Sequence, residues 1–481
     1  MEKKPAKNNI LEGDLRKNLV RFAMPIAATS ILQQLFNSAD TAVIGRFSNT
    51  SALAAVGTNA EIVALLVSIS SGLAVGLNVL VAWKIGQKKQ SEINRVIHSG
   101  IGLSLLIGCF LFVSVFLLSE PVLRLIQTPE ESFRQAVLYL RLYAAGLPFL
   151  LLYDFACAIE RSRGNSRRPM IALVISGILN IGLNLFFVII CKLNVAGVAL
   201  ATDISTGFSG FLTLHWLSSD PDEDFRFSIR HVSLDKEYIS SILRIGTPAA
   251  LQGAVFCFAN IFVQAAVNEF GATATAGAAA AMNFEYITYY MITAFAQTAT
   301  TFTSQNQAAG CHRRCLQILR QCILFALLFS AAISIPITLF CHPASSFFSS
   351  DTGVIEAACQ RIRIILMLTP ICSLYEVPAG YLRGYGKSLL PAVETIIGTC
   401  LVRILWIFTG FRHFHTLQML YMIFPVSWFI TIFLLWVSTG KHIRERHRFF
   451  QTSVSTAVNE DILASEKPAG APAGFLKSNE M

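Results

Sequence analysis

The chain gathers its apolar residues into segments of about 20 to 30 residues, and short charged loops separate them. A helix rises about 1.5 Å per residue, so each segment is long enough to cross the roughly 30 Å hydrocarbon core of a bilayer. Hydrophobic residues make up 54% of the chain, charged residues 14%, and the mean hydropathy is +0.56. Transmembrane strands would alternate apolar and polar residues over about ten positions. We therefore predict an all-α polytopic membrane protein.

Twelve segments are candidate transmembrane helices, six in each half of the chain. They are residues 19–45, 56–83, 95–118, 134–160, 169–191, 195–217, 239–268, 277–306, 317–341, 356–383, 389–411 and 416–438. We number them as spans one to twelve.

The loops between spans differ in their basic residues. Alternate loops are rich in them, whereas the intervening loops hold lone cases such as Arg46, Lys192 and Arg412. By the positive-inside rule the rich loops face the cytoplasm, and with an even number of spans both termini do too. We expect a multi-pass protein of the cytoplasmic membrane. The basic residues of the rich loops are Lys84, Lys88, Lys89, Arg95, Arg161, Arg163, Arg167, Arg168, Arg226, Arg230, Lys236, Arg313, Arg314, Arg320, Arg383 and Lys387.

The net charge of +9 follows from this loop bias and does not indicate a nucleic-acid partner. Most of the eleven cysteines lie in apolar segments and are typical of small hydrophobic side chains. The spacing Cys311-His312-x-x-Cys315 resembles half of a metal site, but no second cluster completes it. We expect no structural metal and no cofactor.

The two halves of the sequence resemble each other. "LVRFAMPIAATSILQQLFNSA" from Leu19 lies against "ILRIGTPAALQGAVFCFANIF" from Ile242, which places Pro25 on Pro248. Further pairs at nearly the same offset are Asn37 with Asn260, Pro148 with Pro370, Tyr153 with Tyr375, Asp154 with Glu376, Arg161 with Arg383, Gly164 with Gly386 and Pro169 with Pro391. Six spans per half means that both repeats enter the membrane in the same direction.

Two parallel six-helix lobes around a central cleft suit transport by alternating access. The predicted parts are a cytoplasmic N-terminal segment (1–18), an N-terminal lobe (19–217), an inter-lobe linker (218–238), a C-terminal lobe (239–438) and a basic segment with a tail (439–481). The acidic run from Ser219 to Phe225 is expected to be solvated. The tail beyond about residue 450 is expected to be disordered.

An acid inside the first span, Asp40, is the strongest functional signal. A charged Asp at the centre of a membrane helix costs roughly 2.5–3.5 kcal/mol, even on the milder insertion scales. Such residues are rare and by default indicate function. The alternative is that the span is wrongly placed and Asp40 lies in a loop; it is less favoured because Thr41 and the residues after it continue the apolar segment.

Several stretches resemble the multidrug and toxic compound extrusion (MATE) transporters, in their DinF-like bacterial branch. The resemblance extends to about residue 440 and implies a two-lobed, twelve-helix exporter of organic, often cationic compounds. Such exporters are driven by inward flow of protons or sodium ions. The stretches are "LQQLFNSADTAVIGRFSNTSALAAVG" from Leu32, "QNQAAG" from Gln305, "YLRGYGKSLLP" from Tyr381, "GTCLVRILWIF" from Gly398 and "HTLQMLYMIFPVSW" from His415.

The resemblance also implies an ion site in the N-terminal lobe, formed by Asp40, Asn180, Asn184 and Thr202. The sequence departs from the family pattern in two places: many relatives have Asp at the position of Asn184 and an aromatic hydroxyl at the position of Phe36. Asp203 could restore the acid, although neighbouring helical residues point about 100° apart. The sequence therefore does not decide whether the coupling ion is H⁺ or Na⁺.

The residue types themselves support the grouping. Asn180 and Asn184 share one helical face because they are four residues apart. One carboxylate with amide and hydroxyl oxygens can hold a transient Na⁺, and a buried carboxylate can instead carry a proton. The alternative is a purely structural role, in which the Asn residues and Thr202 only form hydrogen bonds between helices, as polar residues do in membranes.

Other polar residues within the spans are candidates for the cavity or for substrate contact. Asp154 and Glu376 could line the cavity or brace the loops of Arg161 and Arg383. Glu394 and Arg403 are expected to pair with neighbours, and Glu61 is a further candidate for the substrate. The main candidates are Gln34, Asn37, Asp154, Asp203, Asn260, Gln264, Glu285 and Glu376.

A second ion site in the C-terminal lobe is not expected, because Val263 stands opposite Asp40 in the repeat. No GxxxxGK[ST] loop for ATP hydrolysis occurs, so the energy must come from a gradient. We predict a cation-coupled antiporter, not an enzyme, that acts as a monomer on a small organic substrate within the lipid bilayer. The alternatives are a flippase for a lipid-linked saccharide and, less favoured, a membrane-embedded transferase.

Overall fold

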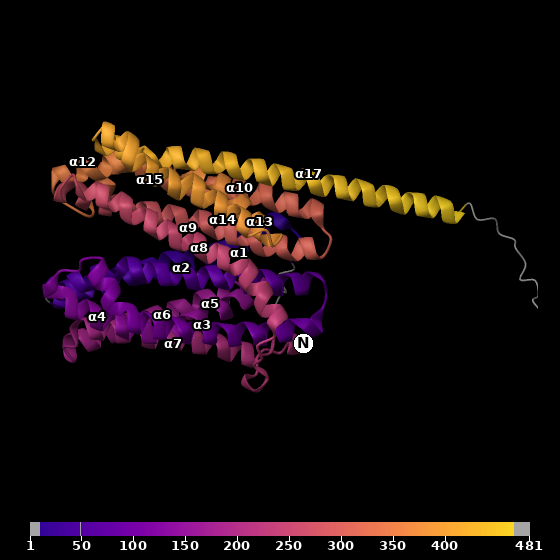
Figure 1. The fold of residues 1–481 in the computed structure, drawn as a ribbon, viewed down its shortest axis with the longest axis horizontal. Coiled ribbons are helices and arrows are strands. Elements are labelled where there is room, and N and C mark those ends of the chain that lie inside the picture. The colour runs from indigo at the N-terminus through magenta and orange to yellow at the C-terminus, as the bar shows by residue number, and fades with distance from the viewer. Residues whose placement is uncertain (1–9, 49, 466–481) are drawn as a thin grey trace, which may run out of the picture. The chain divides into compact units, whose positions relative to one another are not determined.

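The computed structural model describes residues 10–48 and 50–465, all helix and loop, with no strand among them. The chain divides into two compact units, Met1–Leu435 and Trp436–Met481. The first unit contains two helical lobes. In Figure 1 the N-terminal lobe runs from indigo to magenta and the C-terminal lobe from pink to orange.

The N-terminal lobe holds the first six predicted spans. Span four is broken into two helices at Gly146, and span five ends in a π-helical turn. In chain order the elements are α1 (Leu15–Phe47), α2 (Thr50–Gly86), α3 (Gln90–Leu125), α4 (Glu130–Ala145), α5 (Leu147–Ser162), α6 (Arg167–Leu185), η1 (Phe186–Ile190) and α7 (Asn194–Ser218).

Two short 3₁₀ turns, η2 (Glu223–Phe225) and η3 (Ile229–His231), lead into the C-terminal lobe. Its last spans are interrupted repeatedly by π-helical and 3₁₀ segments. The elements are α8 (Lys236–Asn268), α9 (Ala272–Ala308), α10 (His312–Leu339), α11 (Cys341–Ser346), α12 (Thr352–Arg361), η4 (Ile362–Leu366), η5 (Thr369–Cys372), α13 (Ser373–Gly384), α14 (Leu389–Thr395), η6 (Ile396–Leu401), α15 (Val402–Trp406), η7 (Ile407–Phe411), α16 (Leu417–Tyr421) and α17 (Ile423–Ser465).

Each predicted span falls on one helix or on a run of consecutive helices. Ten of these in the described residues are long and apolar enough to cross a membrane, and α4 with α5, bent by 44°, makes an eleventh. The remaining helix, α9, has 37 residues but is rich in Ala and Thr. More than half of its residues are buried among neighbouring helices, so α9 presents little surface to lipid and needs less apolar character.

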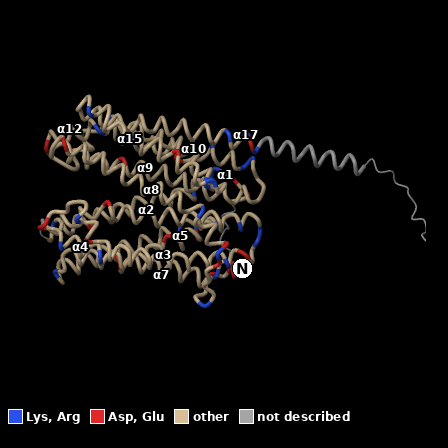
Figure 2. The backbone as a smooth tube through the Cα atoms, viewed as in Figure 1, with Lys and Arg blue, Asp and Glu red and all other residues tan. Residues whose placement is uncertain are grey.

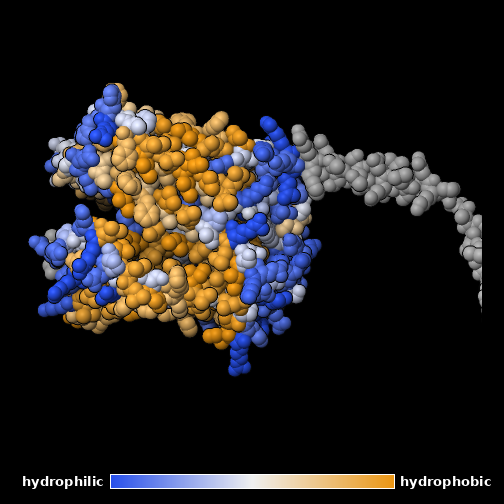
Figure 3. Space-filling view, viewed as in Figure 1, coloured by the Kyte–Doolittle hydropathy of each residue, from blue (hydrophilic) through white to orange (hydrophobic). Residues whose placement is uncertain are grey.

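Charged residues gather at the two ends of the helices (Figure 2), and a wide apolar belt lies between them (Figure 3). We call the end where α2, α5 and α9 finish, at Gly86, Ser162 and Ala308, the basic end, since the loops there are the ones predicted to be rich in Lys and Arg. The other is the opposite end. A belt of this kind is what contact with lipid tails requires.

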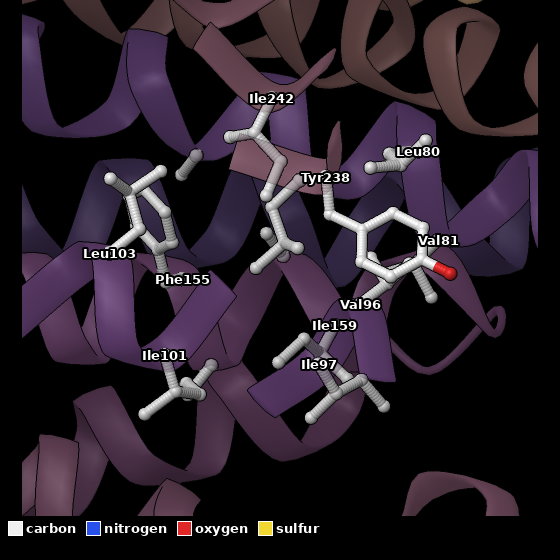
Figure 4. Packing of buried hydrophobic residues seen from close by; sticks show 14 of the residues in the cluster. Leu80, Val81, Val96, Ile97, Ile101, Leu103, Phe155, Ile159, Tyr238 and Ile242 are labelled. Carbon is white, nitrogen blue, oxygen red and sulfur yellow. The ribbon is translucent and has the colours of Figure 1, made fainter. Parts of the chain in front are cut away.

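The lobes meet along α2 and α8, which approach closely because glycines line the crossing. A Cβ atom on Gly76 would lie 2.1 Å from the carbonyl oxygen of Ile242, and one on Gly72 would lie 2.4 Å from the Cα of Ala250. Small residues permit such contact between membrane helices. Figure 4 shows Tyr238 and Ile242 of α8 packed among N-terminal-lobe residues in the same buried cluster.

The inter-lobe linker is folded onto the N-terminal lobe, so the prediction that its acidic run is solvated is wrong for Asp220, although Glu223 in the same run is exposed. Asp220 is 3% exposed, and Phe225 and Phe227 join the buried cluster of that lobe. Asp220 Oδ2 lies 2.7 Å from Arg163 Nη1 and 3.1 Å from Arg168 Nη1. Burial acts to raise the pKa of Asp220, but the two guanidinium groups outweigh it and hold that pKa below its usual range.

The ends of the chain differ from expectation as well. Residues up to Ser465 continue α17, so disorder from about residue 450 is wrong as far as Ser465; residues 466–481 lie outside the described residues. At the N-terminus, Asp14 caps α1 by accepting from the backbone N–H groups of Arg16 and Lys17. Before it, the buried Ile10 and its neighbours receive hydrogen bonds from Arg314 of α10.

Candidate functional site

Asp40 lies two turns before the C-terminal end of α1, toward the opposite end of the molecule. Pro25 sits inside the helix without ending it, and Thr29 Oγ1 donates to the Pro25 carbonyl at 2.7 Å. α1 packs on α6. The acid is thus held on a continuous helix at a membrane depth where a loop could not place it.

Three polar side chains from two other helices surround the carboxylate. Asn184 Nδ2 donates to Asp40 Oδ1 at 2.6 Å and to Asn180 Oδ1 at 3.2 Å. Thr202 Oγ1 of α7 donates to Asp40 Oδ2 at 3.4 Å. Asn180 and Asn184 are buried, whereas Asp40 and Thr202 are half-buried. All four residues predicted from the family resemblance therefore meet in one cluster, which we call the Asp40 cluster.

Gly177 on α6 sets how closely α1 approaches. It lies on the same helical face as Asn180 and Asn184, being three and seven residues before them. A Cβ atom at Gly177 would lie 1.9 Å from Cε2 of Phe36, so the aromatic ring rests directly on the α6 backbone. Phe36, where many relatives have an aromatic hydroxyl, serves here as an apolar contact that positions Asp40 one turn further along α1.

The cluster has the chemistry of a cation or proton site. Asn184 Oδ1 is buried and accepts no hydrogen bond. A buried oxygen without a partner costs free energy that a bound cation would recover. The Asp40 carboxylate, Asn180 Oδ1 and Thr202 Oγ1 are hard oxygen atoms of the kind that Na⁺ prefers, and Asn184 Oδ1 would join them if its amide rotated; the carboxylate by itself can take a proton.

Asp203 lies at the break in span four, and within the described residues no hydrogen bond joins its carboxylate to the Asp40 cluster. A Cβ atom on Gly146 would lie 2.1 Å from Asp203 Oδ1, so the carboxylate rests against the backbone where α4 gives way to α5. Its neighbour Thr202 faces Asp40 instead. This geometry follows from the 100° turn between successive helical residues. In this structure Asp203 is therefore not one of the hydrogen-bonded partners of Asp40.

Asp154 and Glu376, which are equivalent in the repeat, make equivalent contacts. Ser70 Oγ of α2 donates to Asp154 Oδ2 at 2.6 Å, and Tyr289 OH of α9 donates to Glu376 Oε1 at 2.6 Å. In each lobe, therefore, the acid on the fourth helical span of that lobe accepts a hydrogen bond from a hydroxyl group on its second span. The guanidinium groups named as alternative partners contact other residues: Arg161 donates to Gln297, and Arg383 donates to Gln252.

Glu285 forms a buried ion pair with Arg361 of α12. Its two carboxylate oxygens accept from Arg361 Nε at 2.7 Å and Nη2 at 2.9 Å, a bidentate geometry. The guanidinium also faces the ring of Tyr421 at 5.3 Å. Glu285 is thus engaged within the C-terminal lobe. Arg361 is not among the residues predicted from the sequence, because no local pattern indicates a partner 76 residues away.

Asn260 accepts from Arg403 Nη1 at 3.1 Å, and the Arg403 guanidinium lies 4.4 Å from the centre of the Phe424 ring. Arg403 is 1% exposed. The expected pairing of Arg403 with a neighbour is confirmed, through an amide and aromatic faces. The other three candidates have different surroundings. Gln264 of α8 donates to Asn268 of the same helix, and Gln34 of α1 accepts from Tyr290 of the other lobe. Asn37 is exposed.

Contacts between the lobes hold the basic half of the molecule together. Trp83 Nε1 donates to the Gly384 carbonyl at 2.9 Å, and Thr301 Oγ1 donates to Asn78 Oδ1 at 3.0 Å. Gln305 Nε2 donates to the carbonyl of Ser162. Figure 3 shows a notch between the lobes at the opposite end. The lobes are therefore joined at the basic end and apart at the opposite end.

The repeat is also visible in a comparison with known families. The family model described as MatE matches the chain twice, over residues 25–186 and 248–409. These stretches start at Pro25 and Pro248, the pair that anchors the predicted repeat, and together cover well over half of the chain. The chain belongs to the MatE family. It is a multi-pass membrane transporter and not an enzyme.

Relatives of this MatE transporter span almost the whole chain. It is 24% identical over 429 residues to "Probable multidrug resistance protein YoeA" of Bacillus subtilis, covering 87% of this chain and 92% of the relative. It is 27% identical over 414 residues to "Probable multidrug resistance protein NorM" of Thermotoga maritima, covering 83% and 87%.

A solved structure shares the fold. This is the "Outward-facing conformation of a multidrug resistance MATE family transporter of the MOP superfamily", with a TM-score of 0.85 and 21% identity. It covers 93% of this chain and 100% of the other. The predicted two-lobed MATE architecture is confirmed.

Proposed function

We propose that this MatE transporter is a cation-coupled antiporter that exports small organic compounds across the cytoplasmic membrane, with both termini in the cytoplasm. The observation that carries the proposal is the Asp40 cluster: an acid inside a span, with only amide and hydroxyl partners. The names of the relatives favour drugs as substrates and give no support to the flippase alternative. We propose that the monomer is the working unit.

The open and closed ends support the direction of transport. If the basic end is cytoplasmic, as the positive-inside rule predicts, the structure has its cleft open to the outside. In this state Asp40, near the opposite end of α1, is placed to receive an external ion. Binding that ion would neutralise the carboxylate and weaken its hold on Asn184 Nδ2 and Thr202 Oγ1. The packing of α1 on α6 and α7 would change with it, and substrate would leave outward.

Either H⁺ or Na⁺ fits the Asp40 cluster, by different arrangements of one side chain. With Asn184 donating its Nδ2 to Asp40, the ionised carboxylate is stabilised until a proton arrives. With the amide of Asn184 rotated by 180°, Oδ1 takes the place of Nδ2 and lies near Asp40 Oδ1 and Asn180 Oδ1. Three oxygens so close together need a cation between them.

The test is transport by the purified protein in liposomes. We would record movement of a fluorescent organic cation under an imposed proton gradient and then under a sodium gradient. The wild type is expected to respond to one of them and Asp40→Asn to neither. The matched control is Asp203→Asn, which removes a neighbouring carboxylate outside the cluster and should retain coupling. Transport by Asp40→Asn at the wild-type rate would contradict the proposal, as would the absence of wild-type transport under both gradients.

A further inference from the structure

A second group of chemically active side chains lies at the opposite end of the C-terminal lobe. Cys341 and His342 begin α11, immediately after α10, and Cys359 lies on α12. One ligand atom from each, two Sγ atoms and a ring nitrogen, lie within 4.8 Å of one another. Among the described residues this is the one group of three or more His, Cys, Asp or Glu side chains close enough to share a metal ion.

The spacing of these atoms suits a tetrahedral metal. Zinc binds sulfur at about 2.3 Å and nitrogen at about 2.0 Å, so tetrahedral ligand atoms lie about 3.5–3.8 Å from each other. Cys341 Sγ lies 3.7 Å from His342 Nδ1. The remaining separations need to close by at most about 1.3 Å, which rotation of the side chains allows.

The carboxylate of Glu356 lies beside the ring nitrogen of His342 that does not face Cys341. Glu356 Oε2 lies 3.3 Å from His342 Nε2. If Nδ1 binds the metal, Nε2 carries the proton and its N–H donates a hydrogen bond to the Glu356 carboxylate. A histidine held between a metal and a carboxylate in this way is a recurring arrangement that fixes the ring and makes it a better ligand.

Burial and access are also suitable. Cys341 is 2% and Cys359 0% exposed, so both sulfurs are shielded from solvent, while the side chain of His342 is 56% exposed. A hollow in the surface reaches the side chain of His342, although neither cysteine lines it. It is lined by His342, Pro343, Ser346, Thr352, Ile355 and Glu356.

We propose that Cys341, His342 and Cys359 bind one Zn²⁺ ion, with Glu356 as the residue that orients His342. Two thiolates and an imidazole select a soft or borderline ion such as zinc over Mg²⁺ or Ca²⁺, which prefer oxygen ligands. The site goes beyond the proposed transport function and does not rest on it. The ion would tie α11 to α12 and so brace the start of the tenth span.

A second cysteine and histidine motif in the same chain can be compared with this site. Cys311-His312-x-x-Cys315 looks more like a metal motif in the sequence, but its sulfurs lie near backbone carbonyl oxygens: Cys311 Sγ is 3.8 Å from Ala309 O, and Cys315 Sγ is 3.9 Å from Thr303 O. It repeats the Cys-His dipeptide of Cys341 and His342 without forming a cluster of ligand atoms. It is therefore a matched control.

The experiment uses the full-length protein in detergent, reduced and stripped of metal with a chelator. Zn²⁺ would be titrated against a chromophoric chelator, and Co²⁺ would be added separately to look for the absorption band of thiolate-to-cobalt charge transfer. We expect one zinc per chain and a cobalt band in the wild type and in Cys311→Ser. Cys341→Ser and Cys359→Ser should lose both signals. Glu356→Gln should still bind, about 10–100-fold more weakly.

Thermal unfolding separates binding from misfolding, since Zn²⁺ should raise the melting temperature of the wild type but not of His342→Ala. Three results would each overturn the proposal: no zinc bound by the reduced wild type, binding that is lost in Cys311→Ser instead, or a Cys341–Cys359 disulfide in protein purified without reductant. The disulfide would be found by mass spectrometry after alkylation of free thiols.

Discussion

At the scale of single residues, the charges inside the spans are held in different ways. Glu285 and Arg361 neutralise each other, and Arg403 is held by Asn260 and aromatic faces. Asp40 instead has hydrogen bonds from an amide and a hydroxyl, neither of which carries a charge. A carboxylate without a fixed counter-charge can bind and release a proton or Na⁺, whereas the charge of a salt-bridged carboxylate is already neutralised by its partner. Asp154 and Glu376 also accept from neutral hydroxyl groups, so what favours Asp40 as the coupling residue is the group of amide and hydroxyl oxygens beside its carboxylate.

Glu285→Gln is predicted to lower stability rather than to change the choice of substrate. The substitution leaves the Arg361 guanidinium buried without its anion, which costs roughly 3–5 kcal/mol. The apparent melting temperature in detergent should fall, and Glu285→Gln with Arg361→Met should recover much of the loss because no buried charge remains. An unchanged melting temperature with an altered substrate range would mean that Glu285 contacts substrate.

At the scale of elements, the sequence predicts where the spans are better than how they are built. Runs of apolar residues locate the helices, and the repeat relates the lobes. The break at Gly146 and the folded linker depend on contacts with other helices: Gly146 with Asp203, and Asp220 with Arg163. No local pattern contains these partners.

The Asp40 cluster could be predicted because Asn180 and Asn184 share a face and the family resemblance names their neighbours. The direction of Asp203 could be predicted only in part: the helical turn separates it from Thr202, but its contact with Gly146 needs the fold. The partners of Glu285 and Asn260 depend on how the helices pack and could not be read from the sequence.

Two glycines of α6 give a matched prediction. Gly177→Ala places a methyl group against the Phe36 ring, which should push α1 away from α6, cost about 1–3 kcal/mol and slow transport. Gly182→Ala meets no atom within 4 Å and should be tolerated. Transport rates and melting temperatures of both variants check this. Equal effects of the two substitutions would show that Phe36 and Gly177 do not set the position of Asp40.

The folded linker makes a prediction about pH. Arg163 and Arg168 lower the pKa of Asp220 below the value of about 3.9 expected in an unfolded chain, so its contribution to stability is complete above about pH 5. It is lost as the pH falls through the lowered pKa. Asp220→Asn should therefore lower the melting temperature at neutral pH and lose its effect in acid. Glu223→Gln, at an exposed pair, should change little at either pH.

At the scale of the whole molecule, the proposed alternating access requires the contacts at the basic end to open. Trp83 with Gly384 and Asn78 with Thr301 join the lobes there. Each contact is a single hydrogen bond, worth about 0.5–1.5 kcal/mol, so the set can be broken and remade in each cycle. The close approach of α2 and α8 provides a place to prevent this opening.

Ser68→Cys should allow the lobes to be locked. Ser68 Oγ of α2 lies 3.7 Å from Sγ of the native Cys257 on α8, so a cysteine there can form a disulfide between the lobes. Oxidation should stop transport by this variant, and a reductant should restore it. Wild type and Ser68→Cys with Cys257→Ser should be insensitive to the same oxidant. Full activity of the cross-linked protein would show that α2 and α8 do not separate.

The most direct test of the central claim is the reverse flux. If Asp40 binds the coupling ion, a gradient of organic cation must drive ion movement in the opposite direction, because coupled binding is reciprocal. We would measure proton and sodium movement in liposomes after imposing only the substrate gradient. We expect ion flux with the wild type and with Asp203→Asn, and none with Asp40→Asn. Substrate-driven ion flux that persists in Asp40→Asn would contradict it.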